Sequence, residues 1–135
     1  MQTMTTNPEN KNPLQQLING ELKPLVGMEA TSSIPVIKSK AEYLKAVMYE
    51  GVTILEGTAT WCAQCRAIAP EVAKMVDEYP NVKFYLYDVD ECEDVAQELG
   101  VRSMPSFSIF KDGDIQDGVT GAKPKEVRKA IEKCL

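Results

Sequence analysis

Two cysteines separated by two residues, Cys62 and Cys65, carry the clearest chemistry in this sequence. A Cys-x-x-Cys pair either supplies half of a zinc site or cycles between a dithiol and a disulfide. A zinc site needs two further ligands, and only Cys92 and Cys134 remain among the soft ligands because the chain has no histidine. The sequence therefore favours redox chemistry over metal binding at Cys62 and Cys65.

The pair lies where a predicted strand passes into a predicted helix. The apolar run 52–56 predicts a central strand, and the apolar spacing of 62–79 predicts a helix. The first turn of a helix presents unpaired N–H groups and a partial positive charge, which stabilise a thiolate. We therefore expect Cys62 to be the exposed nucleophile and Cys65, one turn deeper, to be the less accessible resolving thiol.

The other elements alternate along the chain and must form the scaffold for this pair. Their order predicts an α/β fold with a central mixed β-sheet flanked by helices on both faces, parallel first and ending in an antiparallel hairpin. We expect strands at 35–38, 82–89, 107–110 and 115–119, a hairpin turn at 111–114, and helices at 40–49, 91–99 and 124–135.

Length and charge exclude several classes of protein. The 135 residues fit about one domain. A net charge of −5 argues against a nucleic-acid binder and against a polybasic membrane-surface protein. No apolar run approaches the roughly 20 residues that cross a bilayer. The lack of histidine removes histidine-based catalytic triads and general bases.

The N-terminal part differs from the rest in composition. Residues 1–11 are polar and lack the regions of a secretory signal, which predicts a cytoplasmic protein in a reducing compartment. Residues 12–32 carry leucines at helix-like spacing, interrupted by Asn19-Gly20 and Pro24. We expect residues 1–32 to be an extension that is partly disordered or forms a short docking helix, and residues 33–135 to be the domain.

Several segments together resemble thioredoxin, in the order and with the spacing of that family. They are the active-site segment 59–70, which contains Trp61-Cys62-Ala63-Gln64-Cys65, and the segments 89–92, 101–107 and 110–113. The resemblance covers about residues 33–135. It implies the thioredoxin fold and a thiol-disulfide oxidoreductase that reduces protein disulfides through a redox-active disulfide between Cys62 and Cys65.

The resemblance also implies roles for residues around the pair. Pro105 matches a cis-proline beside the disulfide, and the backbone of Met104 before it accepts a substrate strand. Glu56 matches a buried acid that exchanges protons with the resolving cysteine; the alternative is a surface carboxylate at a strand end. Trp61 matches an aromatic contact to the partner, with simple packing as the alternative. Ala63 and Gln64, between the cysteines, are expected to contact substrate as well.

The sequence departs from the family in two places that bear on chemistry. Ala63-Gln64 replaces the usual Gly-Pro, and this dipeptide tunes the redox potential in the family. We expect a less reducing potential than the roughly −270 mV of an ordinary thioredoxin. The acid is Glu rather than Asp, and Leu86 stands where a lysine often pairs with it. Without that cation, Glu56 should stay protonated to higher pH.

The resemblance implies no bound cofactor and no metal, with electrons supplied by NADPH through a thioredoxin reductase. We expect a monomer in which Cys92 and Cys134 are inert thiols, although Cys92 could form an oxidative dimer. Two alternatives stay open at this point. One is a more oxidising disulfide oxidase or isomerase, and the other is a non-enzymatic interaction module built on the same fold.

Overall fold

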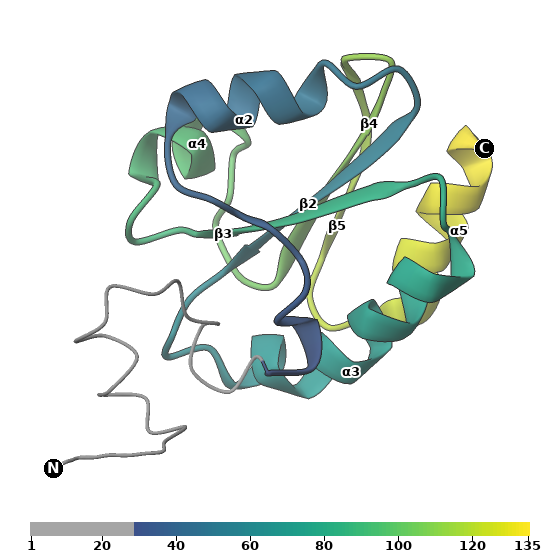
Figure 1. Cartoon of the computed structure of the whole chain (residues 1–135). Coiled ribbons are helices and arrows are strands. Elements are labelled where there is room, and N and C mark those ends of the chain that lie inside the picture. Colours follow the sequence, from purple (N-terminus) through teal and green to yellow (C-terminus); the bar gives the residue numbers. More distant parts are fainter. Residues whose placement is uncertain (1–28) are drawn as a thin grey trace, which may run out of the picture.

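The computed structural model describes residues 29–135. It contains one five-stranded sheet with the strand order β1-β3-β2-β4-β5 (Figure 1). β2 pairs in parallel with β3 and antiparallel with β4, and β4 pairs antiparallel with β5. The predicted mixed sheet with a final hairpin is confirmed. The strands are β1 (Val36–Ile37), β2 (Val52–Thr58), β3 (Lys83–Asp88), β4 (Ser106–Lys111) and β5 (Asp114–Thr120).

Helices cover both faces of this sheet, as the sequence predicts (Figure 1). One face packs against α3 and α5 through a large apolar cluster, and the other packs against α2 and α4 through a smaller one. Every residue of the central strand β2 is buried, because helices lie over both of its faces. The helices are α2 (Lys40–Val47), α3 (Ala63–Glu78), α4 (Glu93–Glu98) and α5 (Pro124–Cys134).

Local sequence explains where the helices begin. The Ser39 hydroxyl caps α2 by accepting a hydrogen bond from the Glu42 N–H at 3.2 Å. Pro124 occupies the first turn of α5, where a missing N–H costs nothing. These signals are local, which is why each predicted helix is present with ends that differ by at most two residues.

A short 3-10 helix, η1 (Glu29–Thr31), precedes β1 and was not predicted. It packs against α3, with Thr31 buried and Ile34 joining the core cluster beneath α3. Residues 29–31 therefore pack against the domain, which the sequence predicts to begin at residue 33. The predictions for residues 1–28 lie outside the described residues.

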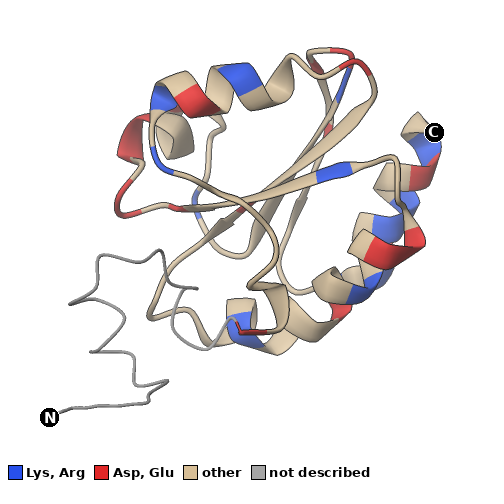
Figure 2. Cartoon of the chain, viewed as in Figure 1, with Lys and Arg blue, Asp and Glu red and all other residues tan. Residues whose placement is uncertain are grey.

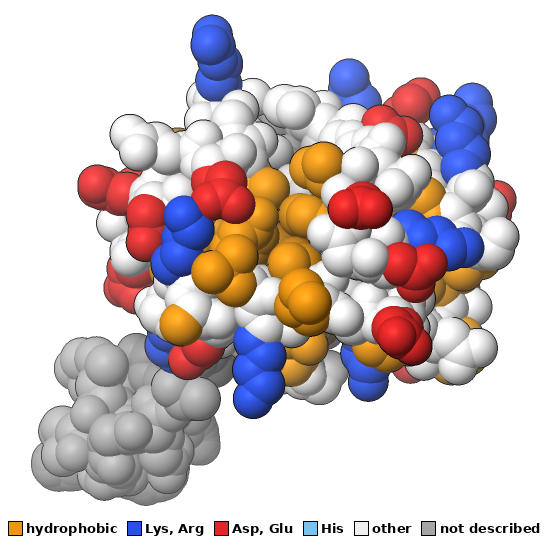
Figure 3. Space-filling model, turned by 90° about the horizontal axis from the view of Figure 1, so that it is seen from above, with side chains coloured by type: hydrophobic (Ala, Val, Ile, Leu, Met, Phe, Trp, Pro, Cys, Tyr) orange, Lys and Arg blue, Asp and Glu red, His pale blue; other side chains and the backbone are white. Residues whose placement is uncertain are grey.

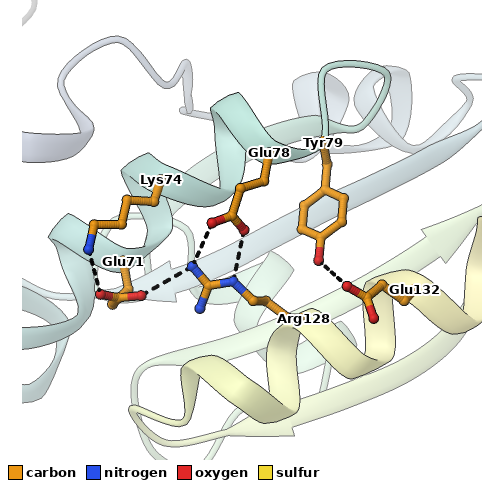
Figure 4. Close-up of polar contacts among 6 residues, drawn as sticks. All are labelled: Glu71, Lys74, Glu78, Tyr79, Arg128 and Glu132. Carbon is orange, nitrogen blue, oxygen red and sulfur yellow. Dashed lines mark hydrogen bonds and ion pairs between the residues drawn. The ribbon is translucent and has the colours of Figure 1, made fainter.

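Charged side chains lie mainly on the helices and loops, and β2 carries only one, Glu56 (Figure 2). The densest cluster joins α3 to α5 (Figure 4). Arg128 of α5 donates from Nε to Glu78 at 2.8 Å and pairs with Glu71 at 3.1 Å, both on α3. The hydrogen bond from Arg128 lowers the pKa of Glu78 below its ordinary value. Ion pairs of this kind contribute modestly, so the apolar cluster beneath them carries the packing of α3 on the sheet.

Candidate active site

The end of β2 delivers the two cysteines to the first turn of α3. Cys62 is the N-cap of α3, and its Sγ accepts a hydrogen bond from the Cys65 N–H at 3.1 Å. The two residues form a disulfide, with their Cα atoms 5.3 Å apart. After reduction, the same N–H and the dipole of this four-turn helix would stabilise a negative charge on Cys62 Sγ.

The burial of the pair differs in part from the expectation. Cys65 is fully buried, at 0% exposed, so it is the deeper of the two. Cys62 is only 6% exposed, so the prediction of an exposed nucleophile is wrong in degree. The reason is tertiary packing, because Cys62 is bonded to the buried Cys65 and belongs to the apolar cluster beneath α3.

Cys62 is reached through an open groove of about 600 Å³. The groove brings together four residues that the sequence singled out around Cys62, and three that it missed. The lining residues are Trp61, Cys62, Ala63, Gln64 and Met104 among the predicted ones, and Arg102, Ser103 and Gly121 among the others. The missed residues come from loops that follow α4 and β5, whose approach to Cys62 depends on the tertiary fold.

Trp61 stands at the edge of the groove, 63% exposed. Its indole Nε1–H donates a hydrogen bond to the carboxylate of Asp90 at 2.8 Å. An aromatic ring left this exposed does not serve core packing, so the structure argues against the packing alternative. Asp90 lies 29 positions away in the sequence, and no local signal indicates that it orients this ring.

The Met104–Pro105 peptide is cis. Pro105 is buried, and its carbonyl accepts a hydrogen bond from the Gly121 N–H at 2.8 Å. This bond ties the loop before β4 to the end of β5, and Met104 then forms one wall of the groove beside Cys62. A cis peptide is essentially restricted to a residue before proline, so this loop shape requires Pro105.

Glu56 lies in the central strand with its side chain in an apolar layer. It is 1% exposed, and its register partners are Leu86 on β3 and Phe107 on β4, both in the core cluster that also contains the two cysteines. Within the described part of the chain, neither carboxylate oxygen has a hydrogen-bond partner. Burial raises the pKa of Glu56 to about 8. The alternative of a surface carboxylate is wrong, because helices cover both faces of β2.

The next residue, Gly57, faces the opposite side of the sheet, where Tyr87 lies. A Cβ at Gly57 would come within 2.8 Å of the Tyr87 hydroxyl oxygen, so only glycine fits under this ring. The Tyr87 side chain is fully buried, and burial raises the pKa of its hydroxyl. No sequence pattern predicts this contact, since the two residues meet only through strand pairing.

The other two cysteines lie in the core. Cys92 is 2% exposed, and its Sγ donates to the Ile37 carbonyl at 3.5 Å. Burial, followed by the charge of Asp94, raises the pKa of the Cys92 thiol above its ordinary value. Cys134 is also buried. A thiol buried in the core is shielded from oxidants and from other thiols, which supports the interpretation that both are inert.

Among residues 29–135, no group of three or more His, Cys, Asp and Glu side chains is arranged to hold a metal ion. None of the helices in the same range has the length and apolar character needed to span a membrane.

A disulfide that caps a helix and opens on a groove can exchange with a second disulfide lying in that groove. With a cis-proline loop on one side and a buried acid behind it, the fold and the site define a thiol-disulfide oxidoreductase of the α/β class.

Comparisons with known proteins identify the family. The thioredoxin family model matches residues 34–133. Thioredoxin-2 of Pyricularia oryzae is 39% identical over 76% of this chain and 60% of that longer protein. Thioredoxin-1 of Saccharomyces cerevisiae is 38% identical over 70% of this chain and 91% of its own length. The crystal structure of oxidised mitochondrial thioredoxin 3 from the same yeast superposes with a TM-score of 0.75, at 32% identity over 77% of this chain and 98% of that one. The chain belongs to the thioredoxin family, whose members are protein-disulfide oxidoreductases that need no bound cofactor.

The raised pKa of Glu56 predicts a specific dependence of stability on pH. The unfolded chain ionises this carboxyl near its ordinary pKa of 4.5, whereas the folded chain keeps it protonated up to about 8. The free energy of unfolding should therefore carry no penalty from Glu56 below about pH 4.5. It should then decline as pH rises from about 4.5 to about 8, because the folded chain resists ionising this carboxyl. We expect Glu56→Leu to remove this decline and to raise the free energy of unfolding by about 4 kcal/mol at pH 8.

Urea denaturation of both proteins across this pH range measures the difference. Glu50→Leu, which removes an exposed carboxyl that forms no ion pair with another residue of 29–135, serves as the control and should leave the decline of stability with pH unchanged. A Glu56→Leu protein whose advantage over wild type is the same at about pH 5 and about pH 8 would contradict the buried, protonated carboxyl.

Proposed function

We propose that this protein reduces disulfide bonds in protein substrates through a cycle of Cys62 and Cys65. The observation that carries the proposal is the Cys62–Cys65 disulfide at the N-terminus of α3, beneath an open groove. Membership of the thioredoxin family supports it. The comparisons favour neither a dedicated oxidase nor a non-enzymatic module.

The cycle balances as two thiol-disulfide exchanges. In the first, the Cys62 thiolate attacks one sulfur of the substrate disulfide, forms a mixed disulfide and releases the other substrate sulfur as a thiolate. In the second, the Cys65 thiolate attacks Cys62 Sγ, the mixed disulfide breaks, and the second substrate thiol leaves. Two electrons pass to the substrate, and the protein is left with the Cys62–Cys65 disulfide.

The surrounding residues would assist these two steps. Glu56 faces the apolar cluster that contains Cys65, since its register partners Leu86 and Phe107 belong to that cluster. With its pKa raised to about 8, it suits a group that takes the Cys65 proton. The backbone of Met104, set by the cis peptide to Pro105, lines the groove and would pair with an extended substrate segment. Trp61, Ala63 and Gln64 also line the groove and would contact the substrate near its disulfide.

We further propose that NADPH, through a thioredoxin reductase, returns the disulfide to the dithiol form, as is usual in the family. Residues 33–135 would form the catalytic domain and residues 1–32 an extension to it. The cytoplasm is the compartment that we propose, although a mitochondrial relative has the same fold. Immunolocalisation of the full chain tests the compartment.

Substitution of each cysteine separates the two steps. The wild type should reduce insulin disulfides in the presence of an excess dithiol, and Cys62→Ser should abolish the activity because no nucleophile remains. Cys65→Ser should instead accumulate a mixed disulfide with insulin, visible on non-reducing gels. Cys134→Ser should keep full activity and is the matched control. A wild type without activity would contradict the proposal and support an interaction module.

The residues between the cysteines should make the potential less reducing than about −270 mV. Gln64 is in the first turn of α3, where its N–H adds a donor near Cys62 that the family's proline lacks. Extra donors stabilise the thiolate and hence the reduced form. We expect Ala63→Gly with Gln64→Pro to lower the potential by about 30 mV, a tenfold change in equilibrium constant, in a glutathione titration. A wild-type potential at or below about −270 mV would contradict this expectation.

We propose that the protein is a monomer whose Cys92 does not form oxidative dimers, since its thiol is buried. After peroxide treatment, non-reducing electrophoresis should show a single monomer band for wild type and for Cys92→Ser alike. A dimer band that is present in wild type and lost in Cys92→Ser would assign Cys92 a redox role.

A further inference from the structure

Arg102 is the one charged residue of 29–135 that lines the groove at Cys62. It is exposed, and it forms no ion pair with another residue of this range. The two thiol-disulfide exchanges of the catalytic cycle give this guanidinium no role. An unpaired guanidinium beside a substrate groove is a ready binding group for a carboxylate.

A second cation, Lys123, lies beside the same groove. Gly121, which lines the groove, has a φ of 101°, a conformation that favours glycine. The Lys123 N–H bonds the Gly121 carbonyl at 2.9 Å and closes a tight turn after β5. The Lys123 side chain folds back over this turn, since a Cβ at Gly121 would lie 3.6 Å from Lys123 Cε. Like Arg102, Lys123 is exposed and has no ion pair within the described range.

One hydrogen bond holds the segments of the two cations together. Arg102 precedes the cis-proline loop, and Lys123 follows the end of β5. The Gly121 N–H joins these two segments by its bond to the Pro105 carbonyl at 2.8 Å. Pairing of β4 with β5 therefore places both cations on the side of the groove that carries Met104.

The other charged groups around the active-site segment are already engaged. Asp90 accepts the hydrogen bond from Trp61, and Arg66 donates to a backbone carbonyl of this segment at 3.0 Å. Among the described residues, none that lines the groove is acidic, so the groove itself offers Arg102 and Lys123 no anion. The face that carries α2 differs, because basic and acidic side chains both lie around the apolar ones there (Figure 3).

Two unpaired cations contrast with the net charge of −5 of the whole chain. At long range that charge disfavours an anionic partner. At short range the nearest charges dominate, because salt at physiological concentration screens exposed charges more than about 8 Å apart. A segment bound in the groove therefore interacts mainly with the positive charge of Arg102 and Lys123.

The geometry of an extended segment sets where the matching anion would lie. In the proposed function, the substrate backbone pairs with Met104, and Arg102 is two residues from Met104 in the chain. An extended segment advances about 3.3 Å per residue, so two residues span about 7 Å. We therefore place the anion about two residues from the substrate cysteine.

We propose that Arg102 and Lys123 form a binding site for an acidic side chain, aspartate or glutamate, that lies about two residues from the substrate disulfide. We name this pair the cationic site. The inference rests on the proposed function and adds a selection among substrates by charge. Arg102 carries the main contact, because its planar fork binds a carboxylate through two hydrogen bonds, whereas Lys123 adds a point charge.

Three synthetic peptides test the cationic site. They share one intramolecular disulfide and differ only at the position two residues outside each cysteine, which is glutamine, glutamate or lysine. The measured quantity is the rate constant, at limiting concentrations, with which each peptide oxidises the pre-reduced full chain. The charge preference is the rate with the glutamate peptide divided by the rate with the lysine peptide. Division by the same ratio for dithiothreitol removes the intrinsic reactivity of the peptides.

Wild type should show a corrected charge preference of about fivefold for glutamate at low salt, since exposed contacts between a carboxylate and a cation are weak. The preference should shrink as salt is added. Arg102→Gln with Lys123→Gln should bring it close to one. Arg102→Glu with Lys123→Glu should reverse it in favour of lysine, and such a reversal requires a folded, reactive protein.

The matched control removes the same net charge elsewhere. Lys45 on α2 and Lys133 at the far end of α5 are exposed, and neither forms an ion pair with another residue of 29–135. Lys45→Gln with Lys133→Gln should keep the charge preference of wild type. A general loss of Cys62 reactivity cannot imitate the expected result, because it would slow all three peptides alike and leave the preference unchanged.

The outcomes are distinct. Failure of wild type to oxidise with any peptide would contradict the proposed function and the cationic site with it. A wild-type preference near one, or a preference that survives Arg102→Gln with Lys123→Gln, would overturn the cationic site alone. An equal loss in Lys45→Gln with Lys133→Gln would assign the preference to the net charge of the protein, with the same consequence. A faster reaction with the glutamate peptide after Glu9→Gln with Glu21→Gln would assign the site to a carboxylate of residues 1–28 and overturn the proposal.

Discussion

The position of one sulfur atom at the start of α3 organises the site. Cys62 ends the loop from β2 and caps α3, so the atom that reacts is also the atom that accepts a hydrogen bond from the helix N-terminus. A carboxylate or hydroxyl usually fills this position. Use of a sulfur instead couples the helix cap to the redox state, since a thiolate is a better acceptor than a disulfide sulfur. The groove, the cis-proline loop and the buried acid Glu56 are all positioned around this helix cap, where they can act on the two sulfur atoms.

The second unusual feature of the site is a buried carboxyl group, that of Glu56, in a layer whose other side chains are apolar. Glu56 lacks a partner among residues 29–135, and its register neighbours are Leu86 and Phe107. A lysine at position 86 would hold the carboxylate charged, whereas leucine leaves burial as the sole cause of its raised pKa. Ionising Glu56 in the folded protein therefore costs free energy. Buried ionisable groups with strongly shifted pKa values of this kind concentrate at functional sites.

Much of this arrangement could be predicted from the sequence, for a physical reason. Strands, helices and caps depend on residues that are near each other in the chain, and the Cys-x-x-Cys motif lies within one helical turn. The predictions failed where two distant segments meet. The burial of Cys62, the bond from Trp61 to Asp90 and the contact of Tyr87 with Gly57 are all set by tertiary packing. Pairing of β2 with β3 brings Gly57 under Tyr87, and periodicity cannot specify that pairing.

The sheet order also explains how the cis-proline loop is held beside the cysteines. β4 follows directly from this loop and β5 returns to it, since the Gly121 N–H bonds the Pro105 carbonyl. β4 in turn pairs with β2, the strand whose end leads to Cys62. Strand pairing therefore brings Met104 and Cys62 to the same edge of the sheet, so the groove between them depends on the sheet as well as on the loops.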